Sequence, residues 1–123
     1  MPQHFLTIPY PPSVNSYWGF HGHRRYLTPE AVNFKRLVLE EVILTRCPNF
    51  GKDRLEITIT LYPKDKRIRD IDNSIKSCLD ALCEAIVFDD DSQIDVLLVQ
   101  KGENFKGGKA SVTIKSLLHK TDV

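Results

Sequence analysis

Residues 55–62 read Leu-Glu-Ile-Thr-Ile-Thr-Leu-Tyr, an unbroken alternation of apolar and polar side chains. This period of two is typical of a half-buried strand, because successive side chains on a strand point to opposite faces of its sheet. Pro63 ends the pattern, since proline removes the backbone donor that a sheet needs. The segment predicts a strand with one apolar face buried against a second layer.

The next segment, residues 64–76, reads Lys-Asp-Lys-Arg-Ile-Arg-Asp-Ile-Asp-Asn-Ser-Ile-Lys and holds five cations and three carboxylates. It leads into apolar residues spaced three or four apart, which predicts a helix that reaches about residue 86. Three carboxylates, Asp89, Asp90 and Asp91, follow it. Residues 94–101 and 109–117 are strand-like, and we expect the glycine-rich residues 102–108 to join them as a hairpin loop.

On the N-terminal side, residues 3–9 predict a short strand that the following prolines end. Thr28, Pro29 and Glu30 form a good helix start, and apolar spacing continues the helix to about residue 46. Between them, residues 13–27 predict a long ordered loop or irregular hairpin. Its aromatic residues either stack on unpaired bases or pack beneath the loop.

The order β-α-β-α-β-β predicts an α+β fold, a single two-layer domain over residues 1–123 with two helices packed on a small mixed sheet. No apolar run reaches the roughly 18 residues that a membrane span needs, and no secretory signal begins the chain. We therefore expect a cytoplasmic protein without membrane contact. The three cysteines predict no disulfide framework, and the net charge of +1 excludes no class of partner.

The spacing of Asp70 and Asp72 restricts the backbone that holds them. Side chains two positions apart point the same way on an extended chain but about 200° apart on a helix. We expect extended backbone through Asp70, Asp72 as the N-cap, a helix from Asn73, and Lys76 one turn above Asp72. The ordinary alternative is a surface helix cap with an Asp72–Lys76 ion pair.

Asp89, Asp90 and Asp91 raise a question of distance, because a helix of about 13 to 16 residues is about 20 Å long. The two acidic groups meet if residues 88–91 run back along the helix, or if a second copy of the chain supplies the far end. Aspartates without His or Cys are hard oxygen ligands that select Mg²⁺ or Mn²⁺. Their mutual repulsion is a physical reason to expect a cation.

Three segments together resemble the RusA-type Holliday junction resolvases, a family of small dimeric Mg²⁺-dependent endonucleases common in prophages. Residues 7–15, Thr-Ile-Pro-Tyr-Pro-Pro-Ser-Val-Asn, are similar to the family's opening strand and Pro-Pro-Ser-x-Asn turn. Residues 69–76 match its RDxDNxxK motif, and residues 89–94 match its DD-x-Q-[IV] element.

The resemblance implies that Asp70, Asp72 and Asp91 bind metal and act in catalysis, that Asp90 lies at or beside the metal site, and that Lys76 is catalytic. The extra Asp89 receives no role. It further implies a homodimer whose two active sites face one basic surface, so that each subunit nicks one strand of a four-way DNA junction in recombination and repair. Five cationic residues are expected to bind the phosphates that flank the cut, namely Arg24, Arg25, Lys66, Arg67 and Arg69.

Two other functions remain open. In the first, the chain is a non-catalytic dimer that binds branched DNA, Asp72 only caps a helix, and residues 89–91 are a solvated turn. In the second, it hydrolyses free nucleotides, although the sequence has no Walker-type phosphate loop.

Overall fold

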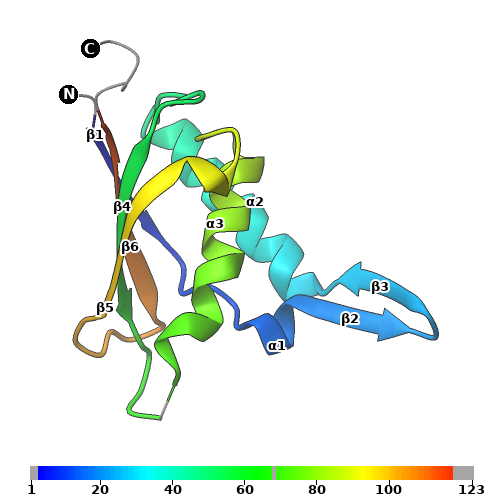
Figure 1. The fold of residues 1–123 in the computed structure, drawn as a ribbon. Helices are drawn as coiled ribbons and strands as arrows, with labels where there is room; N and C mark the ends of the chain where they lie inside the picture. The colour runs from blue at the N-terminus through cyan, green and yellow to red at the C-terminus, as the bar shows by residue number, and fades with distance from the viewer. Residues whose placement is uncertain (1–2, 68, 118–123) are drawn as a thin grey trace.

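The computed structural model describes residues 3–67 and 69–117. Its main sheet has four strands in the order β1-β6-β4-β5 (Figure 1). The strands are β1 (Gln3–Ile8), β4 (Leu55–Tyr62), β5 (Ile94–Lys101) and β6 (Lys109–Ser116). β6 is antiparallel to both β1 and β4, whereas β5 is parallel to β4, so the sheet is mixed. The α+β class and the order of the main elements are as the sequence predicted.

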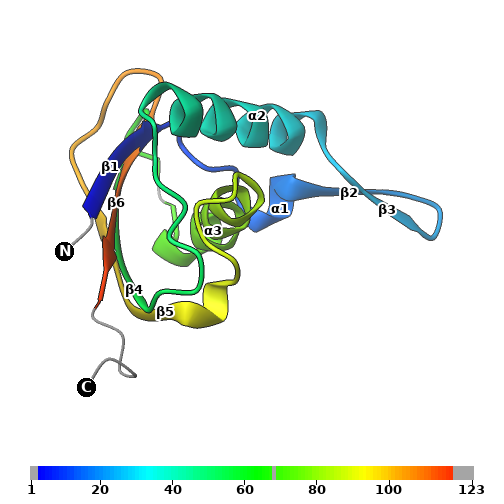
Figure 2. The same cartoon turned by 90° about the horizontal axis from the view of Figure 1, so that it is seen from above.

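Two helices, α2 (Pro29–Leu44) and α3 (Ile75–Glu84), cover one face of this sheet (Figures 1 and 2). The predicted start of α2 is confirmed, because the Thr28 hydroxyl caps it by accepting a hydrogen bond from Ala31 N at 3.2 Å. Among the described residues, neither helix is long and apolar enough to cross a membrane.

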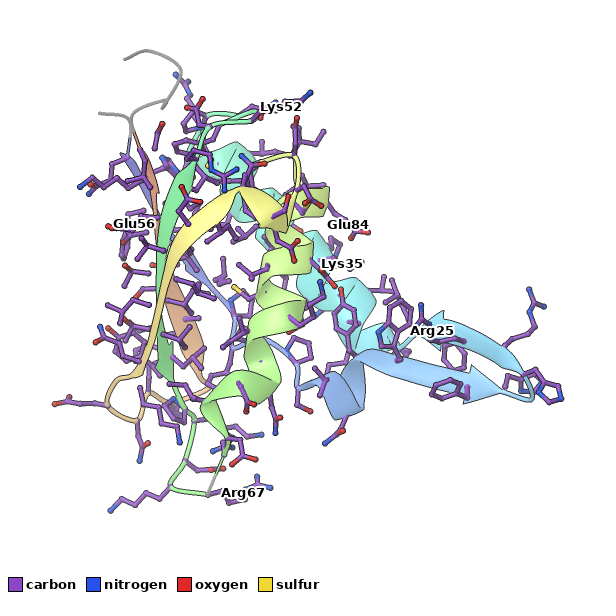
Figure 3. All side chains as sticks on the ribbon, in the orientation of Figure 1. Arg25, Lys35, Lys52, Glu56, Arg67 and Glu84 are labelled. Carbon is purple, nitrogen blue, oxygen red and sulfur yellow. The ribbon has the colours of Figure 1, made fainter. Side chains whose placement is uncertain are left out.

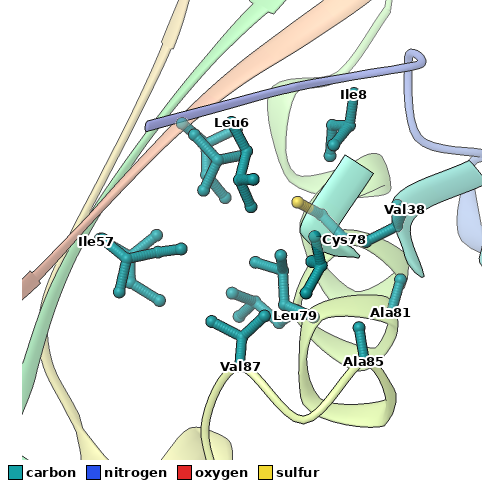
Figure 4. Close-up of a cluster of buried hydrophobic side chains, with 14 of the residues drawn as sticks. Leu6, Ile8, Val38, Ile57, Cys78, Leu79, Ala81, Ala85 and Val87 are labelled. Atoms are coloured by element: carbon teal, nitrogen blue, oxygen red, sulfur yellow. The ribbon is translucent and has the colours of Figure 1, made fainter. Parts of the chain in front are cut away.

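The core lies between the helices and the sheet (Figure 4). The apolar side chains of β4, at Leu55, Ile57, Ile59 and Leu61, are all buried, as their alternation predicted. They meet residues of β1, α2 and α3, including Leu6, Val38, Cys78 and Leu82. The other face of β4 carries half-buried residues such as Thr58 and Thr60 and has no helix over it (Figure 2). This one-sided burial explains the period of two.

The predicted hairpin across residues 102–108 is wrong, because β5 and β6 lie on opposite sides of β4. α3 returns the chain to the starting end of β4, so the strand that follows it, β5, runs parallel to β4 in a β-α-β unit. The connection to β6 then passes the end of β4, where Leu61 O accepts from Gly102 N and Pro63 O accepts from Phe105 N. A Cβ at Gly102 would lie 2.5 Å from the Tyr62 ring, so glycine is needed there.

Of the two structures expected for residues 13–27, a long ordered loop or an irregular hairpin, the structure has a hairpin, preceded by a short helix. A short helix, α1 (Val14–Tyr17), leads into a two-stranded antiparallel hairpin of β2 (Trp18–His21) and β3 (Arg24–Leu27). Both views show the hairpin extending away from the two layers (Figures 1 and 2). The left-handed backbone of Gly22, with φ of 63°, makes the tight turn at its tip. Thr28 anchors its base by donating a hydrogen bond to Ser16 O at 2.6 Å.

Candidate active site

The start of α3 differs from the expectation for Asp72. The backbone is extended at Asp70, but residues Ile71–Ser74 form a 3₁₀ turn, η1, and α3 begins at Ile75. Asp72 therefore lies inside the turn and is not the N-cap, and the prediction of a helix from Asn73 is wrong. Bonds from Asn73 N to Asp70 O and from Ile75 N to Asp72 O tighten the chain here.

The start of α3 is also tied to a distant part of the chain. Ser77, which is buried, donates its hydroxyl to Pro12 O at 2.7 Å and to Ser74 O at 3.2 Å. These bonds tie the first turn of α3 to the Pro-Pro-Ser segment after β1. The carboxylates of Asp70 and Asp72 are left exposed at the N-terminal end of α3.

Lys76 connects the two acidic segments of the sequence. Its Nζ lies 3.2 Å from Asp91 Oδ2 and 3.3 Å from Asp80 Oδ1. Asp91 raises the pKa of Lys76, and Asp80 adds to the effect. The contact requires the chain after α3 to return along the helix within one subunit. α3 is also shorter than predicted, with ten residues, so the return path is short.

A second 3₁₀ turn, η2 (Asp91–Gln93), holds Asp91 in place. Asp90 is its N-cap and accepts from Ser92 N at 2.9 Å, and this interaction with Ser92 lowers the pKa of Asp90. Gln93 Oε1 accepts from Asp89 N and Asp90 N. The Gln93 amide group donates to Gly51 O and Asp53 O.

Gln93 positions the acidic turn, a part that its place in the DD-x-Q-[IV] element did not specify. Its side chain is almost fully buried, at 5% exposure, and binds the acidic turn to the segment before β4. The signal was present in the sequence, because an acidic N-cap followed three residues later by Gln is a capping-box pattern.

The carboxylates fit a hard divalent cation by chemistry, since they offer only oxygen ligands. They do not, however, gather tightly: in the described parts of the chain no three His, Cys, Asp or Glu side chains come close enough to hold a metal ion. Asp91 pairs with the Lys76 ammonium, and Asp90 caps η2. The assignment of Asp70, Asp72, Asp90 and Asp91 as ligands stays a prediction.

The basic segment before Asp70 is organised by Asp65. Asp65 Oδ1 accepts from Arg69 Nη1 at 2.8 Å, and Oδ2 accepts from Arg67 Nη2 at 3.2 Å. These guanidinium groups, Arg69 foremost, lower the pKa of Asp65 far below its usual range. Lys66 is exposed beside them. Two of the predicted DNA-binding residues of this segment, Arg67 and Arg69, are therefore held together by Asp65 near Asp70.

The other predicted DNA-binding residues, Arg24 and Arg25, lie on the β2–β3 hairpin, well apart from Arg67 (Figure 3). The guanidinium of Arg25 lies 4.0 Å from the centroid of the Trp18 ring. Phe20 is 68% exposed and Tyr26 47% exposed, so neither packs beneath the hairpin. The hairpin therefore presents aromatic and cationic side chains to solvent.

Comparison with known proteins agrees with this arrangement of motifs. Residues 9–115 match the family model described as Endodeoxyribonuclease RusA. The chain is 32% identical to the crossover junction endodeoxyribonuclease rusA of Enterobacteria phage HK97 over 95% of its own length and 98% of the relative's. It is 31% identical to the crossover junction endodeoxyribonuclease RusA of Escherichia coli K12, covering 91% of the chain and 93% of the relative. The chain therefore belongs to the RusA endodeoxyribonuclease family.

Proposed function

We propose that this protein is a crossover junction endodeoxyribonuclease that resolves Holliday junctions by paired, symmetric nicks during DNA recombination and repair. The observation that carries the proposal is the 3.2 Å contact of Lys76 with Asp91, which brings the RDxDNxxK segment and the DDxQ segment together. The names and near-complete coverage of the relatives support the same activity. A DNA substrate in a bacterial or phage-infected cell is consistent with work in the cytoplasm.

In this proposal Asp70, Asp72 and Asp91 hold Mg²⁺, with Mn²⁺ as a substitute, and Asp90 fixes the turn beside them. The bound ion would supply polarisation of the phosphoryl oxygen and activation of water. Lys76 contributes a positive charge that holds the scissile phosphate. Its ammonium is already aimed at the acidic site by Asp91.

DNA binding is proposed to use two basic surfaces. Arg67 and Arg69, ordered by Asp65, together with Lys66, bind phosphates near the cut. Arg24 and Arg25 bind phosphates farther out along the hairpin, where exposed Phe20 and Tyr26 can stack on unpaired bases. Such surfaces suit a branched junction, because its arms leave the centre in several directions.

Paired nicks require two copies of a chain with one such site. We propose that the second copy docks on the edge strand β5. Three consecutive apolar residues of β5 are exposed to solvent: Val96 at 45%, Leu97 at 41% and Leu98 at 52%. Their side chains alternate between the two faces of the sheet, so both faces of this edge strand expose apolar surface. A long apolar edge strand with unpaired backbone groups is a template for pairing with another chain.

The substitution Asp70→Asn tests the assignment of the site. We expect it to slow Mg²⁺-dependent cleavage of a synthetic four-way junction by at least about a hundred-fold, because a proposed ligand loses its charge. Junction binding measured in EDTA should be preserved or tightened, since a charge that repels phosphate is removed. Asp89→Asn is the matched control and should cleave normally. Normal nicking by the Asp70→Asn enzyme would reject the site.

One observation favours the alternative of a non-catalytic junction-binding dimer: within the described residues the carboxylates do not form a group of three. That function predicts junction binding with a steep salt dependence and no product in Mg²⁺ or Mn²⁺. The cleavage assay on the unmodified protein separates the two, because divalent-dependent symmetric cuts are expected only of the nuclease.

A further inference from the structure

A cleft of about 660 Å³ opens beside Asp70, and Asp70 is one of its lining residues. Four parts of the chain line it: the segment after β1, the start of α2, described residues of the stretch before α3 (Lys64, Arg67, Arg69, Asp70, Asn73 and Ser74) and the glycine turn before β6. Its size lies in the range of about 300 to 1,000 Å³ that is usual for small-molecule sites. The cleft is therefore large enough for a single nucleotide.

The charges of the lining suit an anion. Lys64, Arg67 and Arg69 face two carboxylates, Glu30 and Asp70. The Arg67 and Arg69 guanidinium groups are held side by side because both bind Asp65, one to each carboxylate oxygen. A pre-ordered guanidinium pair loses little side-chain freedom on binding and matches the geometry of a phosphate.

The remaining lining suits a base. Tyr10 supplies an aromatic ring, 6.0 Å from the Arg69 guanidinium, and Asn73 supplies an amide that can both donate and accept. Ser16 adds a hydroxyl group to the lining. These are the kinds of groups that stack on an unpaired base and bond its edge.

Gly108 keeps the wall close to Tyr10. Its backbone is left-handed, with φ of 74°, and an added Cβ would lie 3.2 Å from Tyr10 Cβ. A side chain there would be strained and would push the glycine turn away from the ring. The glycine thus shapes the cleft rather than only ending a loop.

We propose that this cleft is a subsite for one unstacked nucleotide adjacent to the cleaved bond, with its phosphate on the Arg67–Arg69 pair and its base against Tyr10. Asn73 and Ser16 then contact the edge of the base, which makes them determinants of where the enzyme cuts. The inference rests on the proposed nuclease function. A base leaves the stack most easily at a branch point, where its neighbours are already distorted.

Abasic junctions test the subsite. Each junction carries one abasic nucleotide, moved stepwise around the cut, and single-turnover cleavage is measured. We expect one position at which the missing base slows the unmodified enzyme about tenfold or more, within the roughly 1 to 3 kcal/mol that stacking of one base contributes. Tyr10→Leu should slow cleavage of the intact junction and add little further loss at that position. Tyr62→Leu, on the uncovered face of β4, is the matched control and should leave the abasic effect unchanged.

A second measurement does not depend on cleavage or on the stability of a variant. Deoxynucleoside monophosphates are titrated into the unmodified protein while backbone amide NMR signals are followed. Shifts at Asn73, Gly107 and Gly108 that inorganic phosphate does not reproduce are expected. Equal shifts with phosphate alone, or normal cutting with no sensitive abasic position, would overturn the base subsite and leave the nuclease function intact. Absence of cleavage by the unmodified enzyme would instead count against the proposed function.

Discussion

The carboxylates around Lys76 determine the protonation state of its side chain. Its two carboxylate partners, Asp91 and Asp80, raise its pKa, so the side chain stays protonated through the neutral range. A group with a raised pKa is a poor base at neutral pH, since it holds its proton. Lys76 is therefore suited to holding an anion and not to deprotonating a water.

We predict that Lys76→Met lowers junction cleavage by about a hundred-fold or more, because a fixed charge next to the scissile phosphate is lost. Binding in EDTA should change only a few-fold, since one phosphate contact among several is removed. Single-turnover cleavage and a gel-shift titration measure the two effects.

The matched control for this prediction is Lys35→Met. Lys35 is likewise a helix lysine with a carboxylate partner, but it lies on α2 and its partner is Glu84, the last residue of α3, so this ion pair joins the two helices and includes no residue of the acidic motifs (Figure 3). Its variant should cleave at the normal rate at temperatures where it is folded. Cleavage by Lys76→Met that matches the Lys35 control would exclude a catalytic role for Lys76.

At the scale of elements, the turn after α3 is held by one side chain. Gln93 binds two backbone N–H groups of the acidic turn and two carbonyl groups near β4, all with its buried amide. Phe50 N also donates to Val87 O, so the turn is fastened to the same segment by backbone. The position of Asp91 thus depends on contacts about 40 residues away in sequence.

We predict that Gln93→Ala lowers the free energy of unfolding by about 2 to 4 kcal/mol, because buried backbone groups lose their partners. Cleavage should also fall at temperatures where the variant is folded, since Asp91 is no longer held against Lys76. Urea unfolding and a cleavage assay check the two effects.

Gln100→Ala is the control for that substitution. Gln100, on β5, donates an exposed hydrogen bond to the Thr60 hydroxyl on β4, and its loss should cost no more than about 0.5 kcal/mol. Equal destabilisation by the two alanine variants would show that the acidic turn does not depend on Gln93.

The elements themselves were largely predictable, because β4, α2 and α3 carry strong local patterns. Strand pairing was not predictable in the same way. The pattern of β5 identifies a strand but does not say which strand pairs with it. Because α3 returns the chain to the start of β4, β5 pairs with β4 and not with β6. The 3₁₀ turn at Asp72 escaped prediction because Asp72 and the residues after it carry an ordinary helix-start pattern, and the contact of Ser77 with Pro12, 65 residues away, cannot be read from that local pattern. The motif residues were identified from sequence, whereas the Lys76–Asp91 contact needed the return path that Gln93 fixes.

At the scale of the whole molecule, the sheet has two edges with different character. β1 forms one edge and exposes Phe5, whereas β5 forms the other and exposes three consecutive apolar residues. β5 also follows η2 directly, so a partner on this edge would lie next to Asp91. Antiparallel self-pairing centred on Leu98 would set Asp95 opposite Lys101 of the second copy at both ends, so opposite charges and not like charges would meet there. Within each copy Asp95 already pairs with Arg54, and Lys101 donates to Arg69 O.

We therefore predict that Leu98→Lys converts a dimer to a monomer, because the two-fold axis would bring the new lysines together on a strand edge. Sedimentation velocity measures the mass of the variant. Cleavage of a cruciform plasmid distinguishes paired nicks from single nicks, and we expect the Leu98→Lys variant to make single nicks. Phe5→Lys places the same charge on the opposite edge and should remain a dimer that cuts in pairs. If Leu98→Lys stays dimeric while Phe5→Lys dissociates, the second copy docks on β1 and not on β5.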